Sequence, residues 1–341
     1  LVDRYLAMDE ADQDGFIDLL ASDYSYAADK LQNAASAYAQ NPGDDTYRVL
    51  RNAVESPRQE LLRRINMAPD GTATIVKLRE RLLNRIAEAP HLKTLDTDLR
   101  HLLSSWFNRG FLQFERIEWR TPAAILEKLI TYEAVHEIKG WGDLRRRLAD
   151  DRRCFAFFHP ALTDEPLIFV EVALTNELSG QIGPLLDTPP ESSGGNPTTA
   201  IFYSISNCQT GLAGISFGNF LIKQVVDVLS QELPTIKTFS TLSPIPGFRR
   251  WLTSTPAEFR PDFVSDSDFA ALSSSGTLDD ADKRSEMKKL ITKLCATYLT
   301  STNSRNLPLD PVARFHLGNS ASVERINWDG DLSDKRISQS A

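Results

Sequence analysis

The hydrophobic pattern of this chain changes near Phe114, and that change limits the possible folds more than any other feature of the sequence. Over roughly the first hundred residues, apolar side chains recur with the spacing of an amphipathic helix. Short segments that contain proline, some of them with glycine, interrupt this pattern at 41–43, 68–71 and 89–90. The pattern predicts about four or five helices in an antiparallel bundle. Pro57 should kink or divide the second of the long helices.

Beyond Phe114 the hydrophobic pattern is that of strands, because short runs rich in β-branched and aromatic residues replace the helical pattern. The runs that we expect to form strands are 154–158, 167–174, 199–206 and 236–242. A helix is expected between the last two runs, another over 278–299, and a mobile loop over 187–197. The sequence therefore predicts an α+β protein. An all-helical bundle domain over residues 1–114 would precede a mixed α/β domain over residues 115–341.

The charge and composition argue against several classes of function. Lys and Arg number 38 against 46 Asp and Glu, so the formal net charge is −8 and nucleic acid is not an expected partner. No apolar run approaches the length of about 18 residues that is needed to cross a bilayer, so no membrane association is expected. The three cysteines are far apart and no secretory signal is present, which is typical of a cytoplasmic protein. None of the five histidines forms an HxxH or HExxH pair, so no local zinc site is expected.

Three segments contain residues suited to chemistry. Residues 201–226 place three glycines between an expected strand and an expected helix, where backbone near a helix N-terminus suits phosphate. This segment matches neither the P-loop nor the GxGxxG pattern, and a glycine-rich turn that only packs tightly is an equal alternative. Ser243 lies just past an expected strand, although most Ser-Pro turns have no chemical role. His316 lies on a short apolar helix that favours the neutral imidazole, although a lone histidine there is more often a core residue.

Five segments taken together resemble the malonyl-CoA decarboxylase family. They are FFHPALTDEPLIFVEVALT (157–175), IFYSISNCQTGLAGISFGNFLIKQVV (201–226), FSTLSPIPGF (239–248), DPVARFHLGN (310–319) and RINW (325–328). Their order and spacing agree with the family over residues 115–330, and the N-terminal helices agree more loosely in length and character. The resemblance is specific, because SPIPGF and ARFHL are unusual strings that occur here in a fixed order.

The resemblance implies an acetyltransferase-like (GNAT) C-terminal domain and a helical N-terminal domain that mediates contacts in a homo-oligomer, a dimer or a tetramer. It implies that malonyl-CoA is converted to acetyl-CoA and CO2 without a metal or an organic cofactor. His316 would protonate the enolate, and Ser243 would be its hydrogen-bonding or proton-relay partner. The segment expected to contact the acyl-CoA consists of Ala213, Gly214, Ile215, Ser216, Phe217, Gly218 and Asn219.

Two features depart from the family pattern. Some members have glutamate where this chain has Ser216, and the family continues into a segment with an active-site tyrosine, so the C-terminal end at Ala341 is expected to be incomplete.

Two other functions stay open: an acyltransferase of the same fold that acts on an amine, and a non-catalytic acyl-CoA-binding interaction protein. Lys223 is a candidate for the local positive charge that an anionic CoA ester requires.

Overall fold

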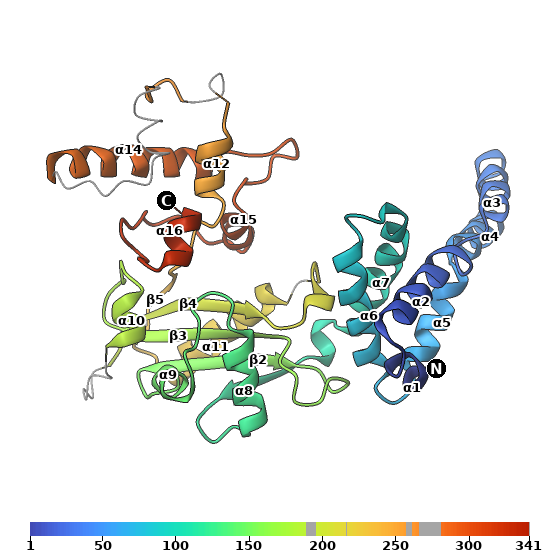
Figure 1. Ribbon diagram of the computed structural model, residues 1–341, viewed down its shortest axis with the longest axis horizontal. Coiled ribbons are helices and arrows are strands. Elements are labelled where there is room, and N and C mark those ends of the chain that lie inside the picture. The colour runs from blue at the N-terminus through green and yellow to red at the C-terminus, as the bar shows by residue number, and fades with distance from the viewer. Residues whose placement is uncertain (189–195, 216, 257–260, 266–280, 341) are drawn as a thin grey trace. The chain divides into compact units, whose positions relative to one another are not determined.

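The computed structural model describes residues 1–188, 196–215, 217–256, 261–265 and 281–340. The chain begins with a helical region, shown in blue to teal in Figure 1. Its elements are α1 (Val2–Leu6), α2 (Glu10–Ser22), α3 (Ala28–Gln40), α4 (Asp44–Val54), α5 (Pro57–Asn66), α6 (Gly71–Arg85), η1 (Pro90–Leu92), α7 (Lys93–Trp106) and η2 (Arg109–Phe111). Pro57 does divide the second long helix, because α4 ends at Val54 and α5 begins at the proline. Proline suits that position since the first backbone N–H of a helix has no partner within it.

A five-stranded mixed sheet follows the helical region. Its strands are β1 (Gln113–Ile117), β2 (Arg152–Phe158), β3 (Ile168–Thr175), β4 (Thr199–Asn207) and β5 (Thr238–Thr241). They lie in the order β1-β2-β3-β4-β5, with β1 antiparallel to β2 and β4 parallel to β5. The connection from β4 to β5 contains η3 (Thr210–Leu212) and α11 (Gly218–Glu232), as parallel pairing requires a long crossover. The predicted fold class is confirmed as a helical region followed by a mixed α/β domain.

The strand that the sequence pattern did not predict is β1. It lies at the edge of the sheet, and Ile117 is its one fully buried side chain. The neighbouring β2 and the central β3 are buried along most of their length, which is why they appear as continuous apolar runs. An edge strand with exposed Gln, Glu and Arg side chains has no such run.

By the density of its contacts, the chain divides into two compact units. The first contains residues 1–148, 154–170 and 205–225, and the second contains residues 149–153, 171–204 and 226–341. The further helices are α8 (Ala123–Tyr132) and α9 (Trp141–Arg147) in the first unit, and α10 (Gly183–Asp187), α12 (Phe248–Ser254), α14 (Ala281–Thr300), α15 (Pro311–Gly318) and α16 (Asp334–Ser340) in the second. A domain boundary at residue 114 stays a prediction. Most of the expected loop at 187–197 lies outside the described residues.

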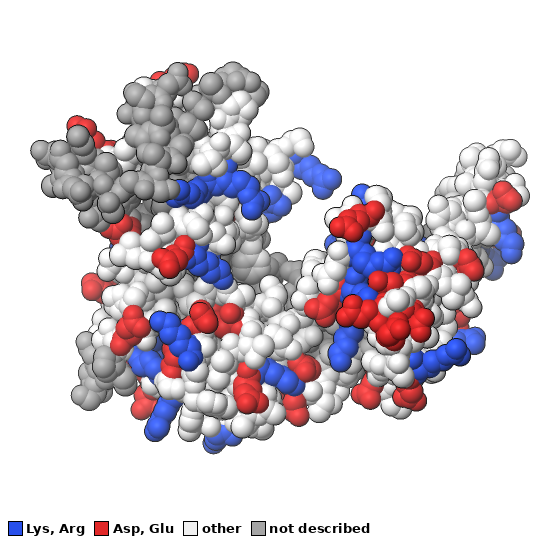
Figure 2. Space-filling view, viewed as in Figure 1, with Lys and Arg blue, Asp and Glu red and all other residues white. Residues whose placement is uncertain are grey.

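Each unit has an apolar core of its own. In the first unit, Leu129 of α8 and Leu144 of α9 are fully buried in a cluster with Phe169 of β3. In the second unit, Phe248 of α12 and Leu294 of α14 belong to another cluster. In the described parts of the chain, no helix is long and apolar enough to cross a membrane. Acidic and basic side chains are mixed over the helical region on the face shown in Figure 2.

Gly71, at the start of α6, is under a steric constraint that Gly15 in α2 does not share. A Cβ on Gly71 would lie 1.8 Å from the carbonyl oxygen of Ile65, whereas nothing lies within 4 Å of a Cβ on Gly15. We predict that Gly71→Ala lowers the free energy of unfolding by at least about 2 kcal/mol. Gly15→Ala should raise it by about 0.5–1 kcal/mol, because alanine loses less backbone entropy in a helix. Chemical denaturation measures both effects, and equal stabilities of the two variants would contradict the close approach at Gly71.

Candidate functional site

Ser243 and His316 are 73 residues apart in the sequence and meet in the second compact unit. Ser243 Oγ lies 3.0 Å from His316 Nε2, and the imidazole tautomer decides which of the two atoms donates the hydrogen bond. Both side chains are partly buried. The structure therefore brings together the two residues that the resemblance marked as partners.

Ser243 lies in the turn that leaves β5. The N–H of Leu242, next to Ser243, donates to the carbonyl oxygen of Phe202 at 2.9 Å, which continues the pairing of β4 with β5 up to the serine. Pro244 restricts Ser243 to extended backbone conformations. After the turn, the chain enters α12 at Phe248. The serine is thus held at the end of a paired strand.

His316 lies on α15, whose N-terminus is capped by a buried side chain. Asp310 is 1% exposed, and its Oδ1 accepts hydrogen bonds from the backbone N–H groups of Val312 at 3.0 Å and Ala313 at 2.8 Å. Pro311 occupies the first helical position, where its missing N–H has no cost. The cap and the proline fix the start of the helix that carries His316.

Tyr298 of α14 links α12 to α15. Its ring packs against Phe248 and Trp251 of α12, with centroid distances of 5.9 Å and 5.4 Å. Its hydroxyl donates a hydrogen bond to Asp310 Oδ2 at 3.4 Å. Burial, reinforced by the Asp310 carboxylate, raises the pKa of Tyr298 to about 12, so the phenol remains a donor near neutral pH. This one side chain therefore contacts both the helix that follows Ser243 and the cap of the helix that carries His316.

The imidazole of His316 lies in a partly apolar setting. Its ring and that of Phe315 pack in a T-shaped arrangement, with centroids 5.0 Å apart and the ring planes at 75°. Burial lowers the pKa of His316 below its ordinary value of 6.5. The neutral imidazole is favoured, so a proton acquired by this ring is released more readily than one on an exposed histidine.

The glycine-rich loop lies in the first compact unit and packs against α6. A Cβ on Gly211 would lie 2.0 Å from the carbonyl oxygen of Val76, so a residue with a side chain does not fit there. Farther along the loop, the buried Phe217 packs edge-on against Phe107, with ring centroids 6.4 Å apart. Gly214 lies between these two contacts and adopts the left-handed conformation, with a φ of 79°. The loop is therefore anchored on both sides of Gly214.

Ala213 and Gly214 are exposed members of the segment predicted to contact the acyl-CoA. Ser216 and the side chain of Asn219 lie outside the described parts of the structure. The guanidinium of Arg100, an exposed residue of α7, lies beside Gly214, with its Nη2 3.3 Å from the position of a Cβ there. A positive charge thus lies next to the exposed part of the loop.

Cys208 lies in the segment 201–226 that the sequence analysis singled out, next to the glycine-rich loop. Cys208 is buried, and burial, with the nearby Glu133 and Glu165, raises its pKa well above the ordinary value, which suits packing rather than reactivity. Among the described residues, no group of three or more His, Cys, Asp or Glu side chains is placed to hold a metal ion.

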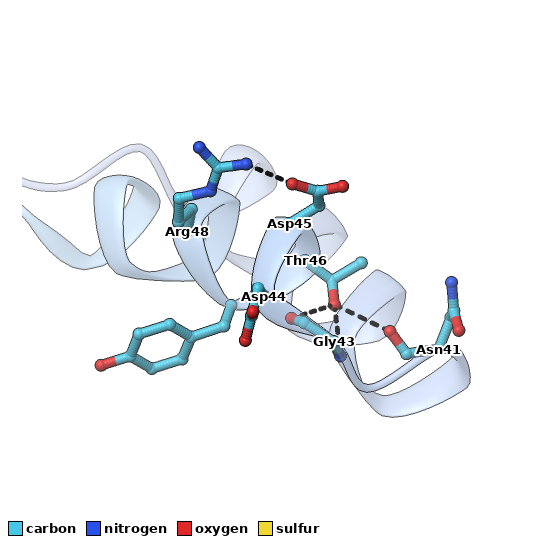
Figure 3. A pocket seen from close by; sticks show the side chains of 7 residues that line it. Asn41, Gly43, Asp44, Asp45, Thr46 and Arg48 are labelled. Carbon is cyan, nitrogen blue, oxygen red and sulfur yellow. Dashed lines mark hydrogen bonds and ion pairs between the residues drawn. The ribbon is translucent and has the colours of Figure 1, made fainter.

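A surface hollow at the turn between α3 and α4 contains none of the predicted site residues (Figure 3). It is lined by Asn41 and residues 43–48. Its contacts are local: Thr46 Oγ1 donates to the carbonyl oxygen of Asn41 at 2.7 Å, and Arg48 pairs with Asp45. These interactions stabilise the turn, and we assign the hollow no role in the site.

Two family models match the chain. The model for the malonyl-CoA decarboxylase C-terminal domain matches residues 110–341, and the model for the N-terminal domain of the same family matches residues 24–107. The chain belongs to the malonyl-CoA decarboxylase family. The resemblance seen in five short segments is confirmed, and it includes the helical region.

Relatives within this family cover most of the chain. The mitochondrial malonyl-CoA decarboxylase of Anser anser anser is 37% identical over 317 residues, which are 84% of this chain and 62% of that protein. The mitochondrial enzyme of Mus musculus is 37% identical over 319 residues, with 85% and 65% covered. This chain therefore spans less than two thirds of the length of these curated relatives.

Solved structures of the family match more completely. The malonyl-CoA decarboxylase from Rhodopseudomonas palustris is 50% identical, with a TM-score of 0.91, and the match covers 99% of this chain and 84% of that one. The malonyl-CoA decarboxylase from Agrobacterium vitis is 48% identical, with a TM-score of 0.90 and the same coverage. The homo-oligomer expected from the family resemblance stays a prediction.

Sequence reasoning missed three residues that hold the Ser243 and His316 segments in place. Asp310 carried a signal, because aspartate directly before a proline is typical of a helix N-cap. Tyr298 and Gly247 carried none, since their contact joins segments that are far apart in the chain. A Cβ on Gly247 would lie 2.2 Å from Tyr298 Oη.

The contact between Gly247 and Tyr298 predicts a coupled pair of substitutions. Gly247→Ala places its methyl group against Tyr298 Oη, so the free energy of unfolding should fall by about 1–3 kcal/mol. In Tyr298→Phe the oxygen is absent, and the next atom, Cζ, lies 3.3 Å from that Cβ. The double variant should therefore be more stable than the sum of the two single effects implies. Denaturation of all three variants measures this coupling, and strictly additive effects would contradict the contact.

The lowered pKa of His316 predicts a pH dependence of stability. Just below pH 6.5 the folded state binds fewer protons at this group than the unfolded state does. The contribution of His316 is therefore fully present above that pH and is lost as the pH falls toward the lowered pKa. We predict that His316→Asn reduces the fall in Tm between about pH 7 and about pH 5. His101→Asn, at an exposed position of α7, is the matched control, and an unchanged pH slope in His316→Asn would contradict the shift.

Proposed function

We propose that this chain converts malonyl-CoA to acetyl-CoA and CO2, with Ser243 and His316 as its catalytic residues. The hydrogen bond of 3.0 Å between Ser243 Oγ and His316 Nε2 is the observation that carries the proposal. Family membership supports it, because proteins named malonyl-CoA decarboxylase match over most of this chain.

The proposed reaction uses the thioester of the substrate as its electron sink. The bond between C2 and the carboxylate carbon breaks, CO2 leaves, and the electron pair passes into the thioester carbonyl to form an enolate. The addition of a proton to C2 completes acetyl-CoA. The protein therefore has to orient the carboxylate, stabilise the enolate and deliver one proton.

His316 is the proposed proton donor. The imidazole takes up a proton from the solvent, which is the one proton that the overall reaction consumes, and the negative charge of a nearby enolate favours this imidazolium form. Transfer of a proton to C2 then returns the ring to the neutral form that burial favours, and the lowered pKa assists this step. Ser243, within hydrogen-bond distance, orients the substrate carboxylate or relays the proton.

The exposed part of the glycine-rich loop is the proposed contact for the CoA part of the substrate. CoA carries phosphate groups, and guanidinium groups bind phosphate through charge-assisted hydrogen bonds. The position of Arg100 beside Gly214 supports this assignment. We favour Arg100 over Lys223 as the source of the positive charge, because the Arg100 guanidinium lies beside Gly214.

Incubation of the purified chain with malonyl-CoA, without an amine acceptor, should release CO2 and form acetyl-CoA. We predict that Ser243→Ala and His316→Ala each lower kcat by about a hundredfold or more, with little change in Tm because neither side chain is fully buried. The double variant should be about as slow as the slower single variant, because residues that act as a unit are not additive. Thr253→Ala removes an exposed hydroxyl from α12 and is the matched control.

Each alternative function has its own outcome in this assay. Release of free CoA from acetyl-CoA only in the presence of an amine would indicate an acyltransferase. Tight binding of CoA esters without turnover would indicate a binding protein. Normal turnover by His316→Ala would exclude His316 as the proton donor.

A further inference from the structure

Arg79 of α6 connects the helical region to the glycine-rich loop. Its side chain is 1% exposed, and its Nη1 donates hydrogen bonds to the carbonyl oxygens of Gly211 at 2.7 Å and Ala213 at 2.9 Å. Its Nε donates to Asp96 Oδ1 of α7 at 2.8 Å. One buried guanidinium, itself held by a carboxylate, thus fixes two carbonyl groups of the loop.

The same face of α6 also contacts the loop backbone. Val76 lies three residues before Arg79, so the two residues share a helix face. The carbonyl oxygen of Val76 occupies the space in which a side chain on Gly211 would lie. Steric contact and hydrogen bonds together therefore hold residues 211–213, directly before the exposed Gly214.

We propose that Arg79 is a positioning residue for substrate affinity, holding the loop backbone in the conformation that receives the CoA part of the substrate. This rests on the proposed function, in which the loop contacts the acyl-CoA. A loop that is already ordered loses less conformational entropy when a ligand binds. Without the guanidinium, the two carbonyl groups lose their hydrogen-bond partner. Ligand binding then has to order the loop, and part of the binding free energy is lost to the conformational entropy of this ordering. Affinity for CoA esters then falls more than the rate of the chemical step.

Arg58 provides a matched control in the same helical region. It is also 1% exposed, and its Nε donates to a carboxylate of α7, that of Asp98. Its Nη1 donates to the carbonyl oxygens of Leu20 and Ala21 in α2. The two arginines differ in what their guanidinium groups hold, because Arg79 holds the loop and Arg58 holds a helix. A general loss of stability should follow the removal of either one.

The test compares Arg79→Met with Arg58→Met in the full chain. Calorimetry with acetyl-CoA, which has no carboxylate to lose, should give a Kd about tenfold or more higher in Arg79→Met than in the wild type. The KM for malonyl-CoA should rise by a similar factor, while kcat stays within about threefold of the wild type. Arg58→Met should keep its Kd within about twofold of the wild type, even where its Tm falls equally. Equal Kd values in the two variants would overturn the role of Arg79.

A milder pair of variants covers the case in which removal of a buried arginine prevents folding. Asp96→Asn and Asp98→Asn keep both arginines and weaken the ion pair that holds each one. Amide exchange over residues 210–215 should accelerate in Asp96→Asn and not in Asp98→Asn, and equal exchange in the two would overturn the proposal.

A wild-type chain that neither binds acetyl-CoA nor releases CO2 would overturn the proposed function, and this inference with it. Wild-type binding with no difference between the matched variants would overturn the role of Arg79 alone.

Discussion

The hydrogen bond between Ser243 and His316 depends on the whole second half of the fold, because nothing local in the sequence sets the distance between its partners. That distance is determined by where β5 ends and where α15 begins. Tyr298 couples the two, since its ring packs on α12 and its hydroxyl donates to the capping Asp310. A displacement of about 1 Å between these elements would break the hydrogen bond, whose geometry tolerates only a few tenths of an ångström.

A similar constraint operates in the first compact unit, where close backbone approach replaces side-chain packing. Gly211 lets the loop rest against the backbone of α6, as Gly247 lets the turn after Ser243 rest against Tyr298 in the second unit. Arg79 then donates hydrogen bonds to the carbonyl groups of Gly211 and Ala213 in this loop. The helical region therefore holds the loop, a role separate from the oligomer contacts that the family resemblance implies.

Much of the fold follows from local patterns in the sequence. Helical periodicity, the division at Pro57 and the buried strands β2 to β4 are all visible in the order of residues. The edge strand β1 was missed because exposed strands lack an apolar run. Arg79 was missed because it resembles any arginine on an amphipathic helix. Its partners, Asp96 and the loop carbonyls, are distant in the chain, and backbone carbonyls have no sequence signature.

The sequence by itself determined the types and order of the elements and, through the family motifs, pointed to the serine and histidine that we propose as catalytic residues. Periodicity, proline and glycine act within a few residues, so the linear order of amino acids records their effects. Only the tertiary structure decided that Ser243 and His316 lie within hydrogen-bond distance and that Arg79 reaches two loop carbonyl groups. These distances result from packing between segments that are far apart in the chain. A shift of one helix or strand changes every contact that it makes, so short stretches of sequence do not record the distances.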